Sequence, residues 1–345
     1  MHKKGPAVTA QAADPIPLED AFDFRGPDAS GQCAAMFYAF NTVVSLQAFA
    51  EEAACREAFQ QALDACRRFE RLFSRTLPHS DISRINDARG AWVDVSRETF
   101  DLLTASVRYC AESGGVFDIT MGSAVRLWDF HRGIIADEAK LKTALRHVDW
   151  RGIEFDEAEN ECDGKTRYRI RLDDPDASVD VGGTAKGYIA DAVGAILLQA
   201  GVHSFIVNLG GNVLAHGMKP DGNPWKIGLQ DPRETRESGK ILGAVPLMDA
   251  SAVTSGTYER SFERGGTTYH HILDPETGFP VQTDIAGATV VARTSLDAEG
   301  YSTTLLALGK ERAVRFVREH PSIMAAYLAD DEGRVVAIEQ PSRPA

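Results

Sequence analysis

Residues 180–201 have the sequence DVGGTAKGYIADAVGAILLQAG, in which an aspartate, a glycine pair and a lysine lead into an amphipathic pattern. Apolar residues then recur at helical spacing, and a glycine follows where a helix would end. The pattern predicts a helix over about residues 186–200 that begins after a turn at Gly182 and Gly183. Free backbone amides, the positive end of the helix dipole and Lys186 would suit an anion such as a phosphate. A glycine pair before a helix is also a common tight turn, so both interpretations stay open.

Composition limits the classes of function. The chain has 345 residues, enough for one large domain or two ordinary ones, and carries a formal net charge of −13. This charge disfavours nonspecific binding to nucleic acid or to anionic membranes, and no stretch approaches the length of a membrane span. The five cysteines show no CxxC spacing, which argues against a zinc site. An acidic protein that binds a phosphorylated ligand needs local positive charge or a metal cation, and we expect the metal.

The chain divides into a lead-in and one domain. Residues 1–34 are rich in Pro, Ala, Asp and Gly without periodicity, which predicts a disordered or loosely attached segment. The domain is expected over residues 35–345, with a helix-rich part at about 50–150 and a strand-rich part at about 151–340. No apolar stretch follows the first lysines, so a cytoplasmic location is expected, or an exported lipoprotein if a leader was removed.

Hydrophobic periodicity predicts an α+β fold. Helices are expected at residues 51–74, 97–113, 136–147, 186–200, 298–308 and 310–319. A strand-like pattern runs from Met36 through FYAFNTVVSLQAF, and further strands are expected at 152–155, 167–172, 204–208, 213–216, 225–229, 250–254, 268–273 and 287–292. Because consecutive strands are joined by short turns, we predict mainly antiparallel sheets with packed helices and a helical N-terminal half, not a doubly wound parallel sheet.

Two further segments could bind a ligand. GGVFDITMGSAVRLWDF, residues 114–130, contains an aromatic residue, an aspartate and a later tryptophan that could cover a flat ring, although it could equally be a turn that lines the core. SAVTSGTYER, residues 251–260, clusters hydroxyl groups after an apolar strand and could hydrogen-bond a polar ligand, or simply form a turn.

Two histidines and a pair of oxygen-bearing side chains are candidates for a catalytic site or a metal site. His270 and His271 would point to opposite faces of the predicted strand, so at most one of them faces a given site. Glu299 and Thr303 are four residues apart on a predicted helix and share a face. A carboxylate and a hydroxyl in this relation could offer hard oxygen ligands to Mg²⁺, or they could be an ordinary helix-start carboxylate and a back-bonded threonine.

Taken in order, nine segments resemble the successive motifs of the FAD:protein FMN transferases, the ApbE-like flavin transferase family, from about residue 36 to 340. The segments are FNTVVSL, LFSRTLPHSDISRIN, GGVFDITMGSAVRLWDF, DVGGTAKGY, NLGGN, WKIGLQDP, SAVTSGTYER, HHILDPETGFPV and EGYSTTLLALG. The resemblance implies a T-fold-related architecture and a Mg²⁺-dependent enzyme. Its substrate would be FAD, whose FMN half would be joined to a threonine or serine hydroxyl of a target flavoprotein with release of AMP.

The resemblance also implies residue roles. The positions that match contacts to FAD are Phe40, Thr76, Val116, Phe117, Asp118, Asp180, Lys186 and Leu273. The positions that match metal ligands are Gly183, through its backbone carbonyl, with Glu299, Ser302 and Thr303. His271 matches a histidine near the reacting phosphate, and with Lys186 and Glu299 it completes the expected catalytic set.

Three positions depart from the family pattern. Phe40 stands where a methionine is common, and Glu299 stands where the family usually has aspartate, which displaces the carboxylate by about one methylene. Thr76 stands where some members place an aromatic residue over the flavin, so stacking there is expected to be weaker, or to be supplied by Trp128 or Tyr301.

Two other functions remain open. Water in place of the protein hydroxyl would make the enzyme an FAD pyrophosphatase that yields FMN and AMP. Failure of Glu299 to assemble the metal site would leave a nonenzymatic FAD-binding protein.

Overall fold

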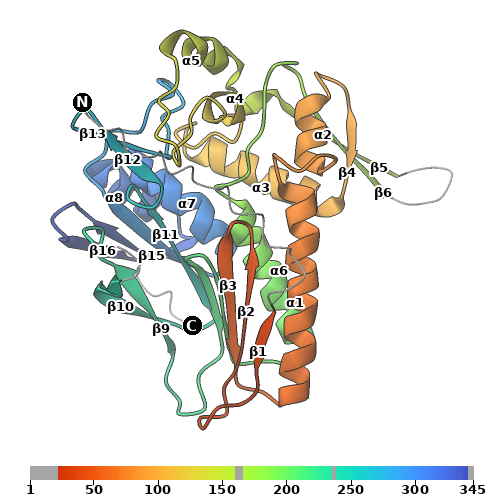
Figure 1. Cartoon of the computed structure of the whole chain (residues 1–345), viewed down its shortest axis with the longest axis vertical. Coiled ribbons are helices and arrows are strands. Elements are labelled where there is room, and N and C mark those ends of the chain that lie inside the picture. Colours follow the sequence, from red (N-terminus) through yellow and green to blue (C-terminus); the bar gives the residue numbers. More distant parts are fainter. Residues whose placement is uncertain (1–21, 160–165, 235–237, 341–345) are drawn as a thin grey trace, which may run out of the picture.

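The computed structural model of the chain describes residues 22–159, 166–234 and 238–340. Among these residues, nine strands form one large sheet in the order β1-β2-β3-β7-β8-β11-β14-β15-β16, and all neighbours are antiparallel (Figure 1). The strands are β1 (Asp23–Arg25), β2 (Cys33–Ala39), β3 (Thr42–Ala48), β7 (Phe205–Leu209), β8 (Asn212–His216), β11 (Ala250–Gly256), β14 (Gly287–Ala292), β15 (Ile323–Ala329) and β16 (Val335–Glu339).

Helices cover one face of this sheet. The helices are α1 (Glu52–Phe73), α2 (Asp81–Asp87), α3 (Arg97–Glu112), α4 (Gly122–Val125), α5 (Glu138–Ala144), α6 (Ala185–Gln199), α7 (Ser295–Leu308) and α8 (Lys310–Glu319). α1 packs on β2 and α6, and α7 packs on α6, β11 and β14, so one core joins the helices to the sheet. Within the described ranges, no helix combines the length and the apolar character that a bilayer span requires.

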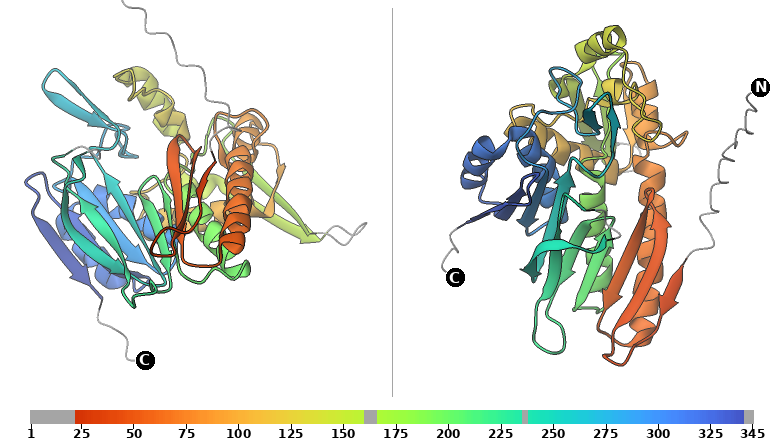
Figure 2. Two further views of the ribbon diagram at one scale, coloured as in Figure 1. Left: turned by 60° about the horizontal axis from the view of Figure 1, so that its bottom comes forward. Right: turned by 60° about the vertical axis from the view of Figure 1, so that its left-hand side comes forward.

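Smaller elements surround the large sheet. The hairpin of β9 (Trp225–Gln230) and β10 (Ile241–Leu247) forms a second core with the opposite face. A three-stranded sheet contains β4 (Val93–Val95), β5 (Ile153–Glu159) and β6 (Thr166–Leu172). The hairpin of β12 (Ser261–Arg264) and β13 (Thr267–His270) stands with α4 and α5 above one end of the large sheet (Figures 1 and 2).

The same end of the large sheet collects several predicted segments. The Phe40–Asn41 turn joins β2 to β3, and the Gly210–Gly211 turn joins β7 to β8. Because β3 pairs antiparallel with β7, and β8 with β11, both turns lie at the end of the sheet where β11 finishes at Gly256. The register therefore gathers segments that are far apart in the sequence.

The predicted class is confirmed, because the structure is α+β with antiparallel sheets. The helix predicted at 310–319 coincides with α8, and the predicted helices at 51–74 and 186–200 match α1 and α6 within a residue. The expected helical N-terminal half is incomplete, because β2 and β3 also come from this half and belong to the large sheet.

The boundary of the lead-in requires correction. Residues 1–21 lie outside the described residues, but β1 and the start of β2 fall within the segment that was expected to be loosely attached. Phe24 pairs with Ala35 across the two strands, and its ring lies 6.1 Å from that of Phe59 in α1. The domain thus includes residues from Phe22 onward, because an aromatic strand there covers the edge of the core.

Candidate functional site

The turn before α6 has the predicted form. The backbone amides of Thr184 and Ala185 both donate to the carbonyl of Val181, and the helix begins at Ala185. Asp180 accepts a hydrogen bond from the Gly182 amide at 2.9 Å. The first turn of α6 therefore presents backbone amides and the positive end of its dipole to the neighbouring α7.

A carboxylate of this chain occupies that helix terminus. Glu299 of α7 is only 3% exposed, and one carboxylate oxygen lies 2.5 Å from the ammonium nitrogen of Lys186. The other oxygen accepts a hydrogen bond from the Gly187 amide. In this structure the negative group at the start of α6 is therefore the side chain of Glu299. Three predicted functional groups, the turn, the lysine and the acid, meet at one point.

Close packing and a buried acid set the position of α7 on α6. A Cβ atom at Gly187 would lie 2.6 Å from the carbonyl oxygen of Ser295, so only glycine allows this approach. Asp191, one turn further along α6, accepts the amides of Ser295 and Leu296 at 2.7 and 2.9 Å. Burial raises the pKa of Asp191 to about 6. These contacts determine how far Glu299 lies from Lys186.

The two predicted hydroxyl ligands lie one turn further along α7. Ser302 is fully buried and donates a hydrogen bond to the carbonyl of Glu299 at 3.0 Å, whereas Thr303 is half-buried. The hydroxyl of Ser255, at the end of β11, lies 2.8 Å from that of Ser302 and 3.0 Å from that of Thr303. Sequence analysis noted the hydroxyls of segment 251–260 but did not single out Ser255.

The second predicted flavin segment contacts the glycine turn. A Cβ atom at Gly183 would lie 2.8 Å from the ring of Phe117, and the Asp180 amide donates to the Ile119 carbonyl at 2.7 Å. Asp118 accepts hydrogen bonds from Thr120, and burial raises the pKa of Asp118. Val116 is half-buried beside them. The segments at 116–118 and 180–186 are therefore neighbours, as a shared ligand would require.

Arg75, which sequence analysis did not single out, contacts Asp180. The guanidinium of Arg75 lies 3.0 Å from the second carboxylate oxygen of Asp180. Thr76 is exposed beside it and bonds with Ser74. Arg75 and Asp180 are separated by more than a hundred residues, and no local signal linked them.

Phe40 occupies a strained turn. Phe40 and Asn41 have φ values of 55° and 56°, as a two-residue hairpin turn that matches the strand twist requires. Such angles are unfavourable for a bulky side chain. The Phe40 amide donates to the carboxylate of Glu70 in α1 at 3.0 Å, which holds the turn.

His271 lies just beyond β13, because the strand ends at His270 and not at 273 as predicted. His270 is buried with its Nε2 3.2 Å from the carbonyl of Val281, whereas the Nδ1 of His271 is buried without a partner. Leu273 forms a bridge with Pro280 in a cluster that contains Trp128. The Nδ1 of His270 is also buried without a partner, so the two histidines differ in that only the Nε2 of His270 lies within hydrogen-bonding distance of a backbone carbonyl.

The two aromatic residues proposed for stacking are packed elsewhere. Trp128 is buried and donates to the carbonyl of Gly278 at 3.1 Å. Tyr301 is 2% exposed, donates to Glu112 at 2.7 Å and packs edge-on against Tyr109. Both rings are used by the core, so neither compensates for the threonine at position 76.

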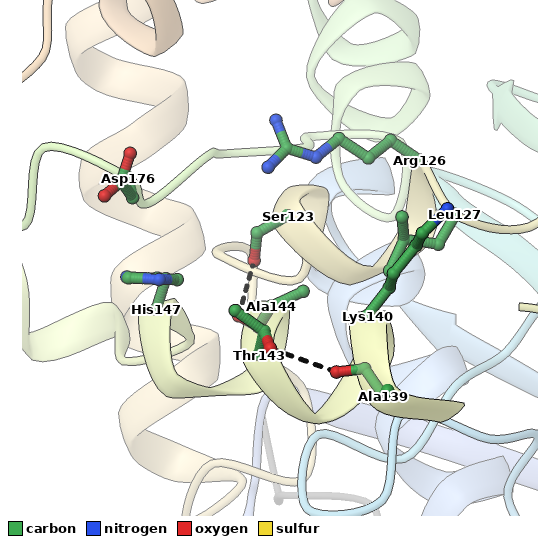
Figure 3. A pocket seen from close by; sticks show the side chains of 9 residues that line it. All are labelled: Ser123, Arg126, Leu127, Ala139, Lys140, Thr143, Ala144, His147 and Asp176. Carbon is green, nitrogen blue, oxygen red and sulfur yellow. Dashed lines mark hydrogen bonds between the residues drawn. The ribbon is translucent and has the colours of Figure 1, made fainter. Parts of the chain in front are cut away.

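A pocket of about 570 Å³ lies apart from these residues, between α4, α5 and the loop that contains Asp176 (Figure 3). His147, Asp174 and Asp176 meet beside it, with candidate metal-ligating atoms within 4.8 Å of one another. His147 already pairs with Asp174 at 2.7 Å, and Arg89 pairs with Asp176 at 2.9 Å. The positive charge of Arg89 in this cluster disfavours the binding of a cation. Glu299 and the hydroxyls of α7, by contrast, form a set of hard oxygen donors that fits Mg²⁺.

His271 predicts a pH dependence of stability. Burial, with a contribution from nearby Arg260, lowers the pKa of His271 from 6.5 to about 3. Below pH 6.5, His271 is protonated in the unfolded chain but stays neutral in the folded chain. The contribution of His271 to the free energy of unfolding is therefore largest above pH 6.5 and falls as the pH decreases towards 3. Between pH 6.5 and 5 we expect a loss of up to about 2 kcal/mol that His271→Asn lacks. Urea unfolding at each pH measures this difference.

The matched control is His203→Asn, at an exposed histidine, which should leave the pH profile of the free energy of unfolding unchanged. Parallel profiles for the natural protein and His271→Asn would contradict the prediction.

Comparisons with known proteins agree on one family. The ApbE family model matches residues 40–328. The FAD:protein FMN transferase of Treponema pallidum is 32% identical over 286 residues, which cover 80% of this chain and 78% of that protein. The FAD:protein FMN transferase of Escherichia coli K12 is 30% identical over 289 residues, which cover 81% of this chain and 77% of that protein.

Solved structures share the fold. The ApbE protein of Thermotoga maritima superposes with a TM-score of 0.77 at 26% identity, over 91% of this chain and 96% of that one. The apo form of the flavinyl transferase ApbE of Pseudomonas stutzeri gives 0.73 at 25% identity, over 92% and 95%. The family match over residues 40–328 and the relatives at 30% identity or more identify the chain as a member of the ApbE family.

Proposed function

We propose that this protein is a Mg²⁺-dependent FAD:protein FMN transferase, which joins the FMN half of FAD to a Ser or Thr hydroxyl of a target flavoprotein through a phosphoester bond and releases AMP. The observation that carries the proposal is the meeting of Lys186, Glu299 and the start of α6 at one point. Support also comes from relatives that bear this name.

The site offers separate groups for a metal ion and for phosphate. Glu299, Ser302, Thr303 and the Gly183 carbonyl would hold Mg²⁺, which when bound would neutralise pyrophosphate charge. Lys186 is about one-third exposed and would exchange Glu299 for a phosphate oxygen when substrate enters. The Gly187 amide, which donates to Glu299 in this structure, would be released for a further phosphate oxygen by the same exchange. Asp180, Phe40, Thr76, Leu273 and the segment from Val116 to Asp118 would bind the rest of FAD.

The reaction balances without a further reactant. The acceptor hydroxyl oxygen forms a bond to the phosphorus of the FMN half, and the bond from that phosphorus to the bridging oxygen breaks, so AMP leaves with the electron pair. The hydroxyl proton passes to His271, whose lowered pKa keeps the imidazole neutral in the free protein, and the negative charge of bound FAD would raise this pKa so that the imidazole can accept the proton. Positioning and electrostatics supply most of the rate in such phosphoryl transfers.

One incubation separates this function from its alternatives. The purified protein is mixed with FAD and Mg²⁺, with and without a candidate acceptor flavoprotein, while AMP is measured by chromatography and acceptor mass by mass spectrometry. We expect AMP only with the acceptor, an acceptor heavier by one bound FMN, and no reaction with a chelator. AMP without acceptor would instead indicate a pyrophosphatase, and bound intact FAD without AMP would indicate a binding protein.

A further inference from the structure

Ser255 joins the two hydroxyls that the proposed function assigns to the cation. It is the sixth residue of β11, and its oxygen lies 2.8 Å from that of Ser302 and 3.0 Å from that of Thr303. Ser255 precedes Ser302 by 47 residues and Thr303 by 48 residues in the chain. A single helix or strand could not bring these residues together, so the contact arises from the packing of α7 on β11.

Counting protons determines the direction of every hydrogen bond in this group. A hydroxyl has one proton to donate, and Ser302 spends it on the Glu299 carbonyl, which can only accept. The bond between Ser255 and Ser302 must then be donated by Ser255. Ser255 has no second proton, so the bond between Ser255 and Thr303 must be donated by Thr303.

This arrangement prepares Thr303 for a cation. With its only proton directed to Ser255, the Thr303 oxygen keeps lone pairs and has no proton left to point at a positive ion. Thr303 is also less buried than Ser302. We propose that Ser255 is a positioning residue, which orients the Thr303 hydroxyl as a lone-pair donor for the divalent cation. This inference rests on the proposed function.

The test measures metal affinity without FAD, using Mn²⁺ as a probe whose free form is counted by electron paramagnetic resonance. Ser255→Ala removes the acceptor and lets the Thr303 proton turn outward, so we expect at least about tenfold weaker Mn²⁺ binding, as for other supporting residues around metal ligands. Ser255→Thr restores a hydroxyl and should recover most of the affinity. A purely structural role would not give this rescue.

Thr254→Val is the matched control. Thr254 precedes Ser255 on β11, points to the other face of the sheet and shares a hydroxyl bond of 2.7 Å with Thr289. Thermal melting should show losses of stability of similar size for Thr254→Val and Ser255→Ala, whereas only Ser255→Ala should weaken Mn²⁺ binding.

Two results would overturn the inference in different ways. Equal Mn²⁺ affinity in Ser255→Ala and the natural protein, or equal weakening in Thr254→Val, would remove the role of Ser255 and leave the cation site standing. If the natural protein does not bind Mn²⁺, or if Glu299→Ala still binds it, the cation site of the proposed function is wrong. This inference would then fail with it.

Discussion

Glu299→Ala is expected to lower the rate of FMN transfer by at least about a thousandfold, since it removes the charged ligand of the proposed cation and the partner that holds Lys186. Glu299 is buried, so its loss also leaves the Gly187 amide without its acceptor. The measurement is the initial rate at which a purified acceptor gains FMN, at saturating FAD and Mg²⁺.

Two companion variants separate chemistry from folding. Glu299→Gln keeps the shape and the acceptor for Gly187 but removes the charge, and we expect it to fold and remain nearly inactive. Asp297 lies in the same helix and pairs with Arg108 at 2.7 Å. Asp297→Asn removes this charge and should retain most activity. Transfer at the natural rate by purified Glu299→Ala in the presence of Mg²⁺ would refute the metal assignment.

Gly187→Ala is expected to reduce transfer by at least about a hundredfold, because the added methyl group would push α7 away from α6. The new Cβ atom would meet the Ser295 carbonyl at 2.6 Å and the Cα of Leu296 at 2.7 Å. These are backbone atoms, so relief requires movement of the helix that carries Glu299. Overpacking of this kind costs about 1–3 kcal/mol, more than the gain of roughly 1 kcal/mol in helix propensity.

Gly194→Ala in the same helix provides the control. Its Cβ atom would meet the Leu214 side-chain tip at 2.6 Å, which can rotate away, and Gly194 lies two turns from the site. We expect this variant to be nearly fully active. Transfer rates for Gly187→Ala that equal those of Gly194→Ala would show that the close approach of α6 to α7 does not matter for the reaction.

Local patterns predicted α1, α3, α6 and α8 closely, but did not predict the short helices α2 and α4. In α1, buried residues from Cys55 to Phe73 recur on one face, and α6 ends at Gln199, two residues before Gly201, whose φ is 79°. Shorter or less regular elements were missed. β15 has the sequence IMAAYLA, whose buried alanines do not alternate with polar residues, and β1 has only three residues.

The candidate site was predictable only as separate segments. The glycine turn, Lys186, Glu299 and the hydroxyls of α7 each followed from residue types and from the family motifs. Their meeting depends on contacts across 112 and 113 residues, and no periodicity encodes such distances. The structure also placed Trp128 and Tyr301 in the core, because large aromatic rings bury more area there than beside a ligand.

By itself, the sequence determined the α+β class, the start of α6 and the chemical groups available for phosphate and metal, since these depend on local propensity and on side-chain type. Only the tertiary structure decided that Glu299 caps α6 and pairs with Lys186, that Arg75 meets Asp180, and that the Ser255 hydroxyl contacts that of Thr303. These pairings arise from sheet register and from helix packing, in which contacts of about 3 Å depend on the whole chain.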